Sequence, residues 1–176
     1  MLGGWWPRVA VAVCLFAVAG CGSPAPAPAA APPAVRASNI GANPCALLTI
    51  GQQHQRGLNQ GAQQPATDGL SEVSCVWSYV PVTPGDTLTG RVIRGPLPGA
   101  TPSSSIVGLP TWQYVPADMD QKTSCIFLVD VAPDETLWVQ YSNTSGDLPG
   151  LNHVVACRKV QNAAANMVSR YRSLPK

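Results

Sequence analysis

Charged side chains are scarce in this chain of 176 residues. Lys and Arg number 11 and Asp and Glu number 9, which together make up 11% of the sequence. The formal net charge is only +2, and the longest run of basic residues is the pair Arg158-Lys159. Nucleic-acid binding depends on a basic patch that neutralises phosphates, so the sequence predicts no nucleic-acid partner.

The short motifs that identify many enzymes are also missing. The two histidines form neither H-x-x-x-H nor H-E-x-x-H, which excludes these zinc-hydrolase motifs. No serine stands in G-x-S-x-G, and neither glycine-rich nucleotide motif occurs. No pair of carboxylates points to glycoside hydrolysis. We therefore predict no catalytic residue, no cofactor and no metal, and a protein that is not an enzyme.

No apolar run is long enough to cross a bilayer, because a spanning helix needs about 20 such residues. The stretch 9–20 follows Arg8, is largely apolar, and ends in small residues directly before Cys21. Its length is typical of the apolar part of a secretory signal, so residues 1–20 are predicted to be a signal peptide.

The tetrapeptide Val18-Ala19-Gly20-Cys21 resembles the lipobox of bacterial lipoprotein signals. The resemblance implies cleavage before Cys21, a diacylglyceryl group on its sulfur, and a new amino group that can also be acylated. Two or more acyl chains hold a protein firmly on a membrane. The expected location is the extracytoplasmic face of the cell membrane, anchored by this lipid. A buried structural cysteine that happens to follow an apolar run is the alternative.

Residues 21–38 are rich in proline and alanine, and Arg36 is their only charged residue. They lack large apolar groups whose burial could offset the entropy lost on folding. Proline favours extended geometry, in which the residues after Cys21 would reach roughly 50 Å. We predict a stalk that carries a single globular, disulfide-bonded domain, residues 39–176. A ligand for a proline-binding domain is the alternative.

Two helices are predicted within this domain. Thr49 and Gln52 have the spacing of a capping box, which indicates a helix over residues 50–56. Near the C-terminus, apolar residues recur every three or four positions from Cys157 to Tyr171, and this stripe predicts a long helix with one buried face.

Five stretches between the helices have the features of strands, and short turns join several of them, which implies antiparallel pairing. The prediction is an α+β fold in which an antiparallel sheet of about five strands is covered on one face by the N-terminal and C-terminal helices. The order of elements is similar to the Mog1/PsbP-like sandwich, a non-enzymatic adaptor fold, and this is an analogy at fold level only. The predicted strands are 72–80, 87–94, 111–115, 123–131 and 136–142.

Four cysteines lie within the domain: Cys45, Cys75, Cys125 and Cys157. An even number in an exported domain indicates two disulfides, and none of the close pairs that zinc prefers is present. We predict the sequential pairing, Cys45–Cys75 and Cys125–Cys157, since each bridge would then attach one helix to the sheet. The crossed pairing, Cys45–Cys125 with Cys75–Cys157, also joins helices to strands and stays open.

Trp112 and Trp138 are the candidate ligand-contacting residues. Aromatic side chains on a sheet face or a cleft wall stack against sugars or line apolar pockets. Packing within the core is the competing and simpler interpretation.

Four segments give the chain a family resemblance: N-P-C-A-L-L-T at 43–49, C-V-W at 75–77, C-I-F-L-V at 125–129 and A-C-R-K-V at 156–160. In this order, behind a lipobox and a stalk, they resemble an actinobacterial family of secreted lipoproteins of unknown function, which includes mycobacterial Lpr-type lipoproteins. The resemblance covers residues 43–173. It implies a cell-envelope protein of a mycolate-bearing actinobacterium and supplies no catalytic residues.

Three functions follow as hypotheses. The first is a lipid-anchored, non-enzymatic binding or adaptor domain whose partner is an envelope protein or a lipid. The second is a lipid or glycolipid carrier, which would require a dry apolar cavity of several hundred Å³. The third is an unrecognised hydrolase, which would require clustered His, Ser and Asp side chains.

Replacing the cysteine of the lipobox tests the predicted anchor. We expect Cys21→Ala to block lipidation and to leave the precursor uncleaved or misprocessed, because the acylated sulfur is lost. Intact-mass measurement and detergent partitioning check this. A variant that partitions into detergent as a processed species of wild-type mass would show that the lipobox assignment is wrong.

Overall fold

The computed structural model describes most of the C-terminal three quarters of the chain. The predicted signal peptide, Cys21 and the stalk lie outside the described residues. These are 40–66, 69, 71–80, 85–95, 102–114, 123–144 and 150–174.

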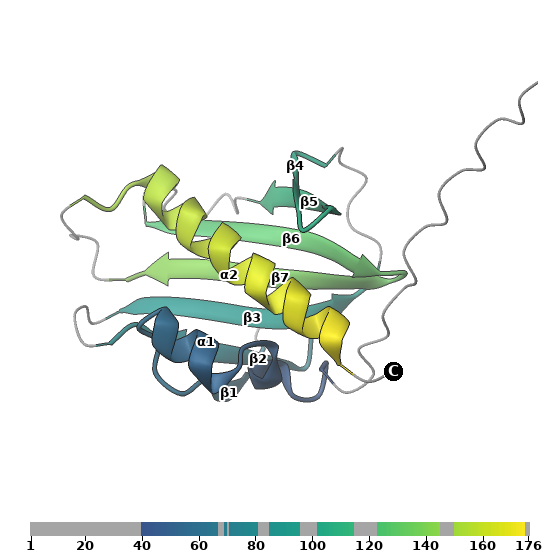
Figure 1. Ribbon diagram of the computed structural model, residues 1–176, viewed down its shortest axis with the longest axis horizontal. Helices are drawn as coiled ribbons and strands as arrows, with labels where there is room; N and C mark the ends of the chain where they lie inside the picture. Colours follow the sequence, from purple (N-terminus) through teal and green to yellow (C-terminus); the bar gives the residue numbers. More distant parts are fainter. Residues whose placement is uncertain are drawn as a thin grey trace, which may run out of the picture. The chain divides into compact units, whose positions relative to one another are not determined.

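The described chain forms one antiparallel sheet of seven strands in the order β1-β2-β3-β7-β6-β5-β4 (Figure 1). The central strands β3, β7 and β6 are the longest, with nine residues each. Their side chains alternate between the two faces of the sheet, as the pleat of a strand requires. The strands are β1 Ala62–Pro65, β2 Val73–Ser78, β3 Asp86–Arg94, β4 Ser104–Ile106, β5 Leu109–Tyr114, β6 Ser124–Ala132 and β7 Glu135–Asn143.

One long helix, α2 (His153–Ser173), covers one face of this sheet and packs mainly on β6 and β7 (Figure 1). The side chain of Asn152 caps the helix by accepting a hydrogen bond from the Val155 amide at 3.0 Å. No helix within the described ranges is both long and apolar enough to span a bilayer. Seven residues of α2 are buried: Ala156, Val160, Ala163, Ala164, Met167, Val168 and Tyr171. Most of the predicted stripe is among them, but Cys157, where it was predicted to begin, is only partly buried.

The α+β class is confirmed, but the predicted number of strands is wrong. Two strands were not predicted, β1 and β4, and they lie at the two edges of the sheet. β1 is exposed along its whole length, and two of the three residues of β4 are exposed. Such short polar strands are held by backbone hydrogen bonds, so they show none of the apolar alternation by which strands are identified.

The predicted role of the N-terminal helix is also wrong. The helix α1 (Ile50–Gln55) has the predicted capping box at Thr49, but it spans only six residues. Its one buried residue is Gln53, whose amide donates to the Leu48 carbonyl at 3.0 Å. Lacking an apolar face, α1 cannot cover a sheet. The short 3-10 helix η1 (Pro44–Leu47) packs on β2 and β3 instead.

Two disulfides fasten these elements together. Cys45–Cys75 joins η1 to β2, and Cys125–Cys157 joins β6 to α2. This is the sequential pairing. The bridged residues are 30 and 32 positions apart, and loops of this length stabilise a fold by roughly 3 to 4 kcal/mol each in the chain-entropy model.

The side chain of Met167 on α2 reaches toward Gly90 in β3. A Cβ atom at this position would lie 3.2 Å from Met167 Cε and 3.2 Å from Trp77 Cζ3, and both side chains are fully buried. A larger residue at position 90 therefore fits only if Met167 and Trp77 shift by a few tenths of an ångström.

A larger side chain at position 90 should separate the helix from the sheet. We expect Gly90→Val to lower the free energy of unfolding by about 1 to 3 kcal/mol, as measured by urea denaturation. Adding Met167→Ala removes the obstructing side chain, so the double variant should lose less than the sum of the single losses. Gly41→Val is the control, since a Cβ there meets nothing within 4 Å. Equal losses at Gly41 and Gly90 would contradict the packing described.

Candidate functional site

The two candidate tryptophans lie on the sheet face away from α2. The register places Trp112, Leu128, Trp138 and Arg91 side by side in one row across β5, β6, β7 and β3. The Arg91 guanidinium lies 4.4 Å from the centroid of the Trp138 ring, a cation–π contact. Tyr114 meets the same ring edge to face, with centroids 5.8 Å apart.

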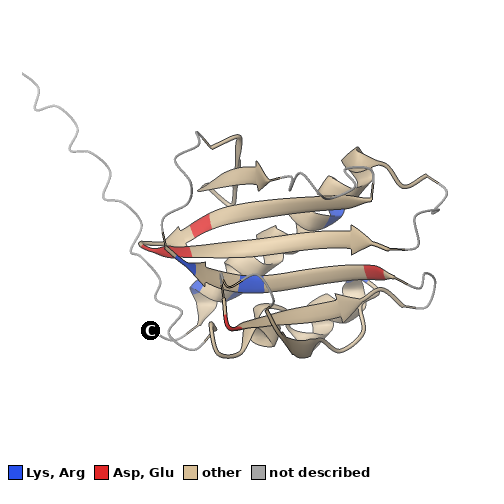
Figure 2. Ribbon diagram, turned by 180° about the vertical axis from the view of Figure 1, so that it is seen from behind, with Lys and Arg blue, Asp and Glu red and all other residues tan. Residues whose placement is uncertain are grey.

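This face forms a second, smaller apolar cluster. Trp138 is only 7% exposed and belongs to it, and Trp112 is half-buried against it. Few residues of the strands are charged (Figure 2). The ring of Trp138 has neighbours on several sides, so the competing interpretation, packing in a core, describes it better than contact with a ligand.

The histidines do not mark a reaction centre. His153 Nε2 lies 2.8 Å from Gln113 Nε2 and 3.5 Å from Cys157 Sγ. That sulfur is bonded to Cys125 and is therefore not a thiolate nucleophile. His54 is exposed on α1. Within the described ranges, no three His, Cys, Asp or Glu side chains come together as a metal site.

A cluster of polar side chains closes one end of the sheet, where β3 begins and β7 ends. The ammonium of Lys159 on α2 lies 2.9 Å from Asp86 Oδ2 and donates to the Tyr141 hydroxyl at 3.2 Å. It also lies 4.5 Å from the ring centroid of Tyr79 and 4.4 Å from that of Tyr141. The Asp86 side chain is only 4% exposed, so this ion pair is largely shielded from water.

Burial raises the pKa of both phenols of this cluster. It raises the pKa of Tyr79 to about 12, with a further increase from the Asp86 carboxylate and an opposing effect of Arg56. Burial also raises the pKa of Tyr141, and its hydrogen bond with Asp86 acts in the same direction. Groups that titrate so far above neutral pH are poorly suited to acid–base catalysis. The cluster fastens α2 to the sheet.

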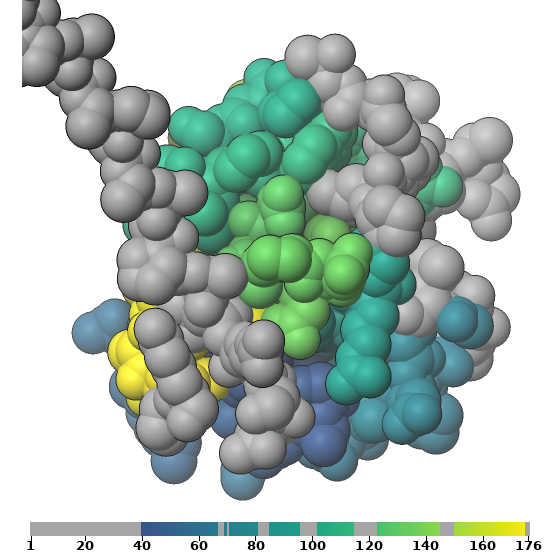
Figure 3. All heavy atoms as spheres, turned by 90° about the vertical axis from the view of Figure 1, so that its right-hand side faces the viewer, coloured from purple at the N-terminus to yellow at the C-terminus, as the bar shows by residue number. Residues whose placement is uncertain are grey.

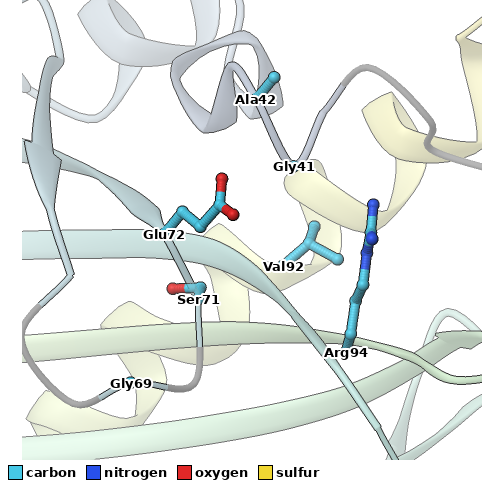
Figure 4. A pocket seen from close by; sticks show the side chains of 7 residues that line it. All are labelled: Gly41, Ala42, Gly69, Ser71, Glu72, Val92 and Arg94. Atoms are coloured by element: carbon cyan, nitrogen blue, oxygen red, sulfur yellow. The ribbon is translucent and has the colours of Figure 1, made fainter.

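A cleft of about 510 Å³ opens at the opposite end, where β2 begins and β3 ends. These strands are antiparallel neighbours, so residues preceding β2 lie beside residues that close β3. The chain just before η1 forms another wall. Figure 3 looks onto this end of the sheet, and Figure 4 shows the cleft. It is lined by Gly41, Ala42, Gly69, Ser71, Glu72, Val92 and Arg94, of which five are exposed.

Three polar groups of this cleft have no partner in the described part of the chain. The carboxylate of Glu72 and the guanidinium of Arg94 stand apart, with Val92 between them in the view of Figure 4. No ion pair joins these two groups or links either to another described residue. Ser71 Oγ is buried and makes no hydrogen bond there. Separated charges of opposite sign, with an unused hydroxyl, can bind a polar ligand.

Among the described lining residues of the cleft, no histidine stands beside Ser71 as the base of a serine nucleophile. A smaller depression of about 350 Å³ between α1 and α2 is lined by Arg56 and Asn162 among others. The Arg56 guanidinium already donates to the Asn162 carbonyl, so that depression is partly closed by the protein's own contacts.

The residues of the cleft were not predicted from the sequence as a binding site. One signal was available: Glu72 begins and Arg94 ends two consecutive predicted strands, and antiparallel pairing brings such ends together. Nothing in the sequence indicated that Gly41 and Ala42 would join them.

Comparison with known proteins places most of the chain in one family profile. The profile is described as "Protein of unknown function (DUF3558)" and matches residues 16–170. No curated protein and no solved structure matches the chain.

Removing the cation of the buried pair should be costly. We expect Lys159→Met to lower the free energy of unfolding by about 2 kcal/mol in urea denaturation, because Asp86 keeps a shielded carboxylate without its cation. Adding Asp86→Asn should recover part of this loss. The exposed Arg158→Met on the same helix is the matched control. A loss at Lys159 no larger than that at Arg158 would refute the structural role of the pair.

Proposed function

The chain belongs to the DUF3558 family of proteins of unknown function, and we propose that it is a lipid-anchored binding or adaptor domain of the cell envelope that performs no catalysis. The lipobox at Val18-Ala19-Gly20-Cys21 supports the anchor. The family profile begins at residue 16 and so includes Cys21. The resemblance to actinobacterial secreted lipoproteins supports the extracytoplasmic face of the membrane as the location.

The cleft beside the end of β3 is the observation that carries this proposal. Glu72 and Arg94 are two charged side chains without an ion-pair partner in the described part of the chain. They project from segments fixed by the sheet, and Cys45–Cys75 fastens the wall that contains Gly41 to β2. Because the backbone is held at these positions, no loop there has to become ordered when a ligand binds, and only the side chains lose freedom.

A carrier for lipids or glycolipids fits these residues less well. Acyl chains require a predominantly apolar cavity. The apolar side chains of the domain pack instead into two clusters, one beneath α2 and one around Trp138. Val92 is the one large apolar residue among the described residues that line the cleft. The carrier therefore stands second, and an unrecognised hydrolase third.

Site-specific photocrosslinking in the membrane tests the proposal. A photoreactive amino acid replaces Ala42, which is exposed in the cleft, or Val154, which is 71% exposed on α2 and serves as the control. The full-length lipidated chain is used in both cases. We expect a crosslinked partner at position 42 and little crosslinking at position 154.

Reversing a charge in the cleft distinguishes a crosslink that depends on specific binding from one that arises by random encounter. Either single change, Glu72→Lys or Arg94→Glu, should abolish the crosslink at Ala42, because the cleft then holds two like charges and one of them repels the group that it formerly paired with. Equal crosslinking at Ala42 and Val154, or a crosslink that survives charge reversal, would reject a binding site in the cleft. Stoichiometric capture of acyl chains at position 42, together with lipid transfer between vesicles, would favour the carrier instead.

A further inference from the structure

We propose that the cleft binds a zwitterionic head group, the phosphoethanolamine of an amine-bearing phospholipid in the membrane that holds the anchor. The inference rests on the proposed function and names the ligand of the same site. It starts from the two separated charges, because one molecule that carries a phosphate and an ammonium can neutralise both.

The anionic half of the ligand is assigned to Arg94. This side chain is exposed at the end of β3 and makes no hydrogen bond or ion pair with any described residue. A guanidinium presents parallel N–H donors that match two oxygens of a phosphate. Its position on a strand end leaves the side chain free to adjust to the ligand while the backbone stays fixed.

The cationic half is assigned to Glu72. Its carboxylate lines the same cleft, apart from the guanidinium of Arg94 (Figure 4). A primary ammonium offers three N–H donors, and a carboxylate can accept them with charge assistance. A phosphodiester without an amine would meet only repulsion from Glu72, so this residue is expected to determine which head group binds.

The remaining lining suits a small polar group. Ser71 Oγ is buried without a partner among the described residues and can donate to a phosphate oxygen. Val92 contributes an apolar surface, against which an ethylene bridge can pack. The volume of about 510 Å³ falls within the range of small-molecule sites, about 300–1,000 Å³.

The membrane is favoured as the source because exposed charges bind weakly. A weak site is occupied only where its ligand is abundant. Gly41 and Ala42, which line the cleft, follow the predicted stalk by a few residues in the sequence. A chain anchored at Cys21 would keep this cleft within roughly 50 Å of the bilayer, where tethering supplies an effective concentration of about millimolar or more.

Titration with soluble head groups tests the assignment. The full-length lipidated protein in an uncharged detergent is titrated with glycerophosphoethanolamine or glycerophosphoglycerol, and binding is followed by calorimetry. We expect the dissociation constant for the ethanolamine compound to be roughly threefold to tenfold lower, because only it pairs with Glu72. Equal constants, or tighter binding of the glycerol compound, would overturn the proposal.

Three variants assign the two halves of the ligand. Glu72→Gln should remove the preference between the two compounds, whereas Arg94→Gln should weaken binding of both by a similar factor. Arg158→Gln, an exposed change on α2, is the matched control and should leave both constants unchanged. A preference that survives Glu72→Gln would contradict the assignment. Thermal unfolding of each variant at the wild-type temperature verifies that the fold is intact.

A free zwitterion distinguishes the source. Glycylglycine carries an ammonium and a carboxylate but no phosphate, and we expect it to bind more weakly than glycerophosphoethanolamine. Equal affinity would reject the head group in favour of a peptide terminus. The crosslink at Ala42 is an independent measurement, so a cleft that captures a protein but shows no head-group preference would retain the proposed function and reject this inference.

Discussion

The packing of α2 against one face of the sheet, mainly on β6 and β7, is the constraint on which the rest of the described structure depends. α2 is the one long helix of the described chain, so it must bury most of one sheet face. The absence of a side chain at Gly90 lets Met167 settle against Trp77, and Cys125–Cys157 fixes the helix over β6. The seven residues that α2 turns toward the sheet are fully buried, whereas the described cleft lies at one end of the sheet.

The two ends of β3 show how the same chemistry serves different purposes. Asp86 begins the strand and is shielded from water, so it needs Lys159 to neutralise it, and the pair contributes to holding α2. Arg94 ends the strand and is exposed, so leaving it without an ion pair costs little. Glu72 is also exposed and lines the same cleft, apart from Arg94. Exposed charged side chains can stay without an ion pair at little cost in stability, so they are available to bind a ligand.

The sequence predicts the parts of this fold whose apolar pattern is strong. The predicted strand 72–80 corresponds to β2, and the stripe from Cys157 to Tyr171 identifies α2. The strands β1 and β4 escape prediction because backbone pairing, rather than burial, holds them. The cleft could not be predicted, because it depends on contacts between segments that are distant in the sequence. β3 pairs with β7 and not with β4, the next strand in the chain, and Cys45–Cys75 brings the segment at Gly41 to the strand ends. The burial of Trp138 also depends on the pairing of β3 with β7, because this pairing places Arg91 beside the Trp138 ring.

Hydrogen exchange of the anchored protein tests the central claim most directly, that ligands meet this domain at the cleft and not on its faces. The full lipidated chain is placed in vesicles of phosphatidylglycerol with or without phosphatidylethanolamine, and amide exchange is compared by mass spectrometry. If the cleft binds the head group, we expect slower amide exchange only at residues 41–42, 71–72 and 92–94 when the amine-bearing lipid is present. Slower exchange along the outward side of α2 or around Trp112, or no difference between the two membranes, would contradict it.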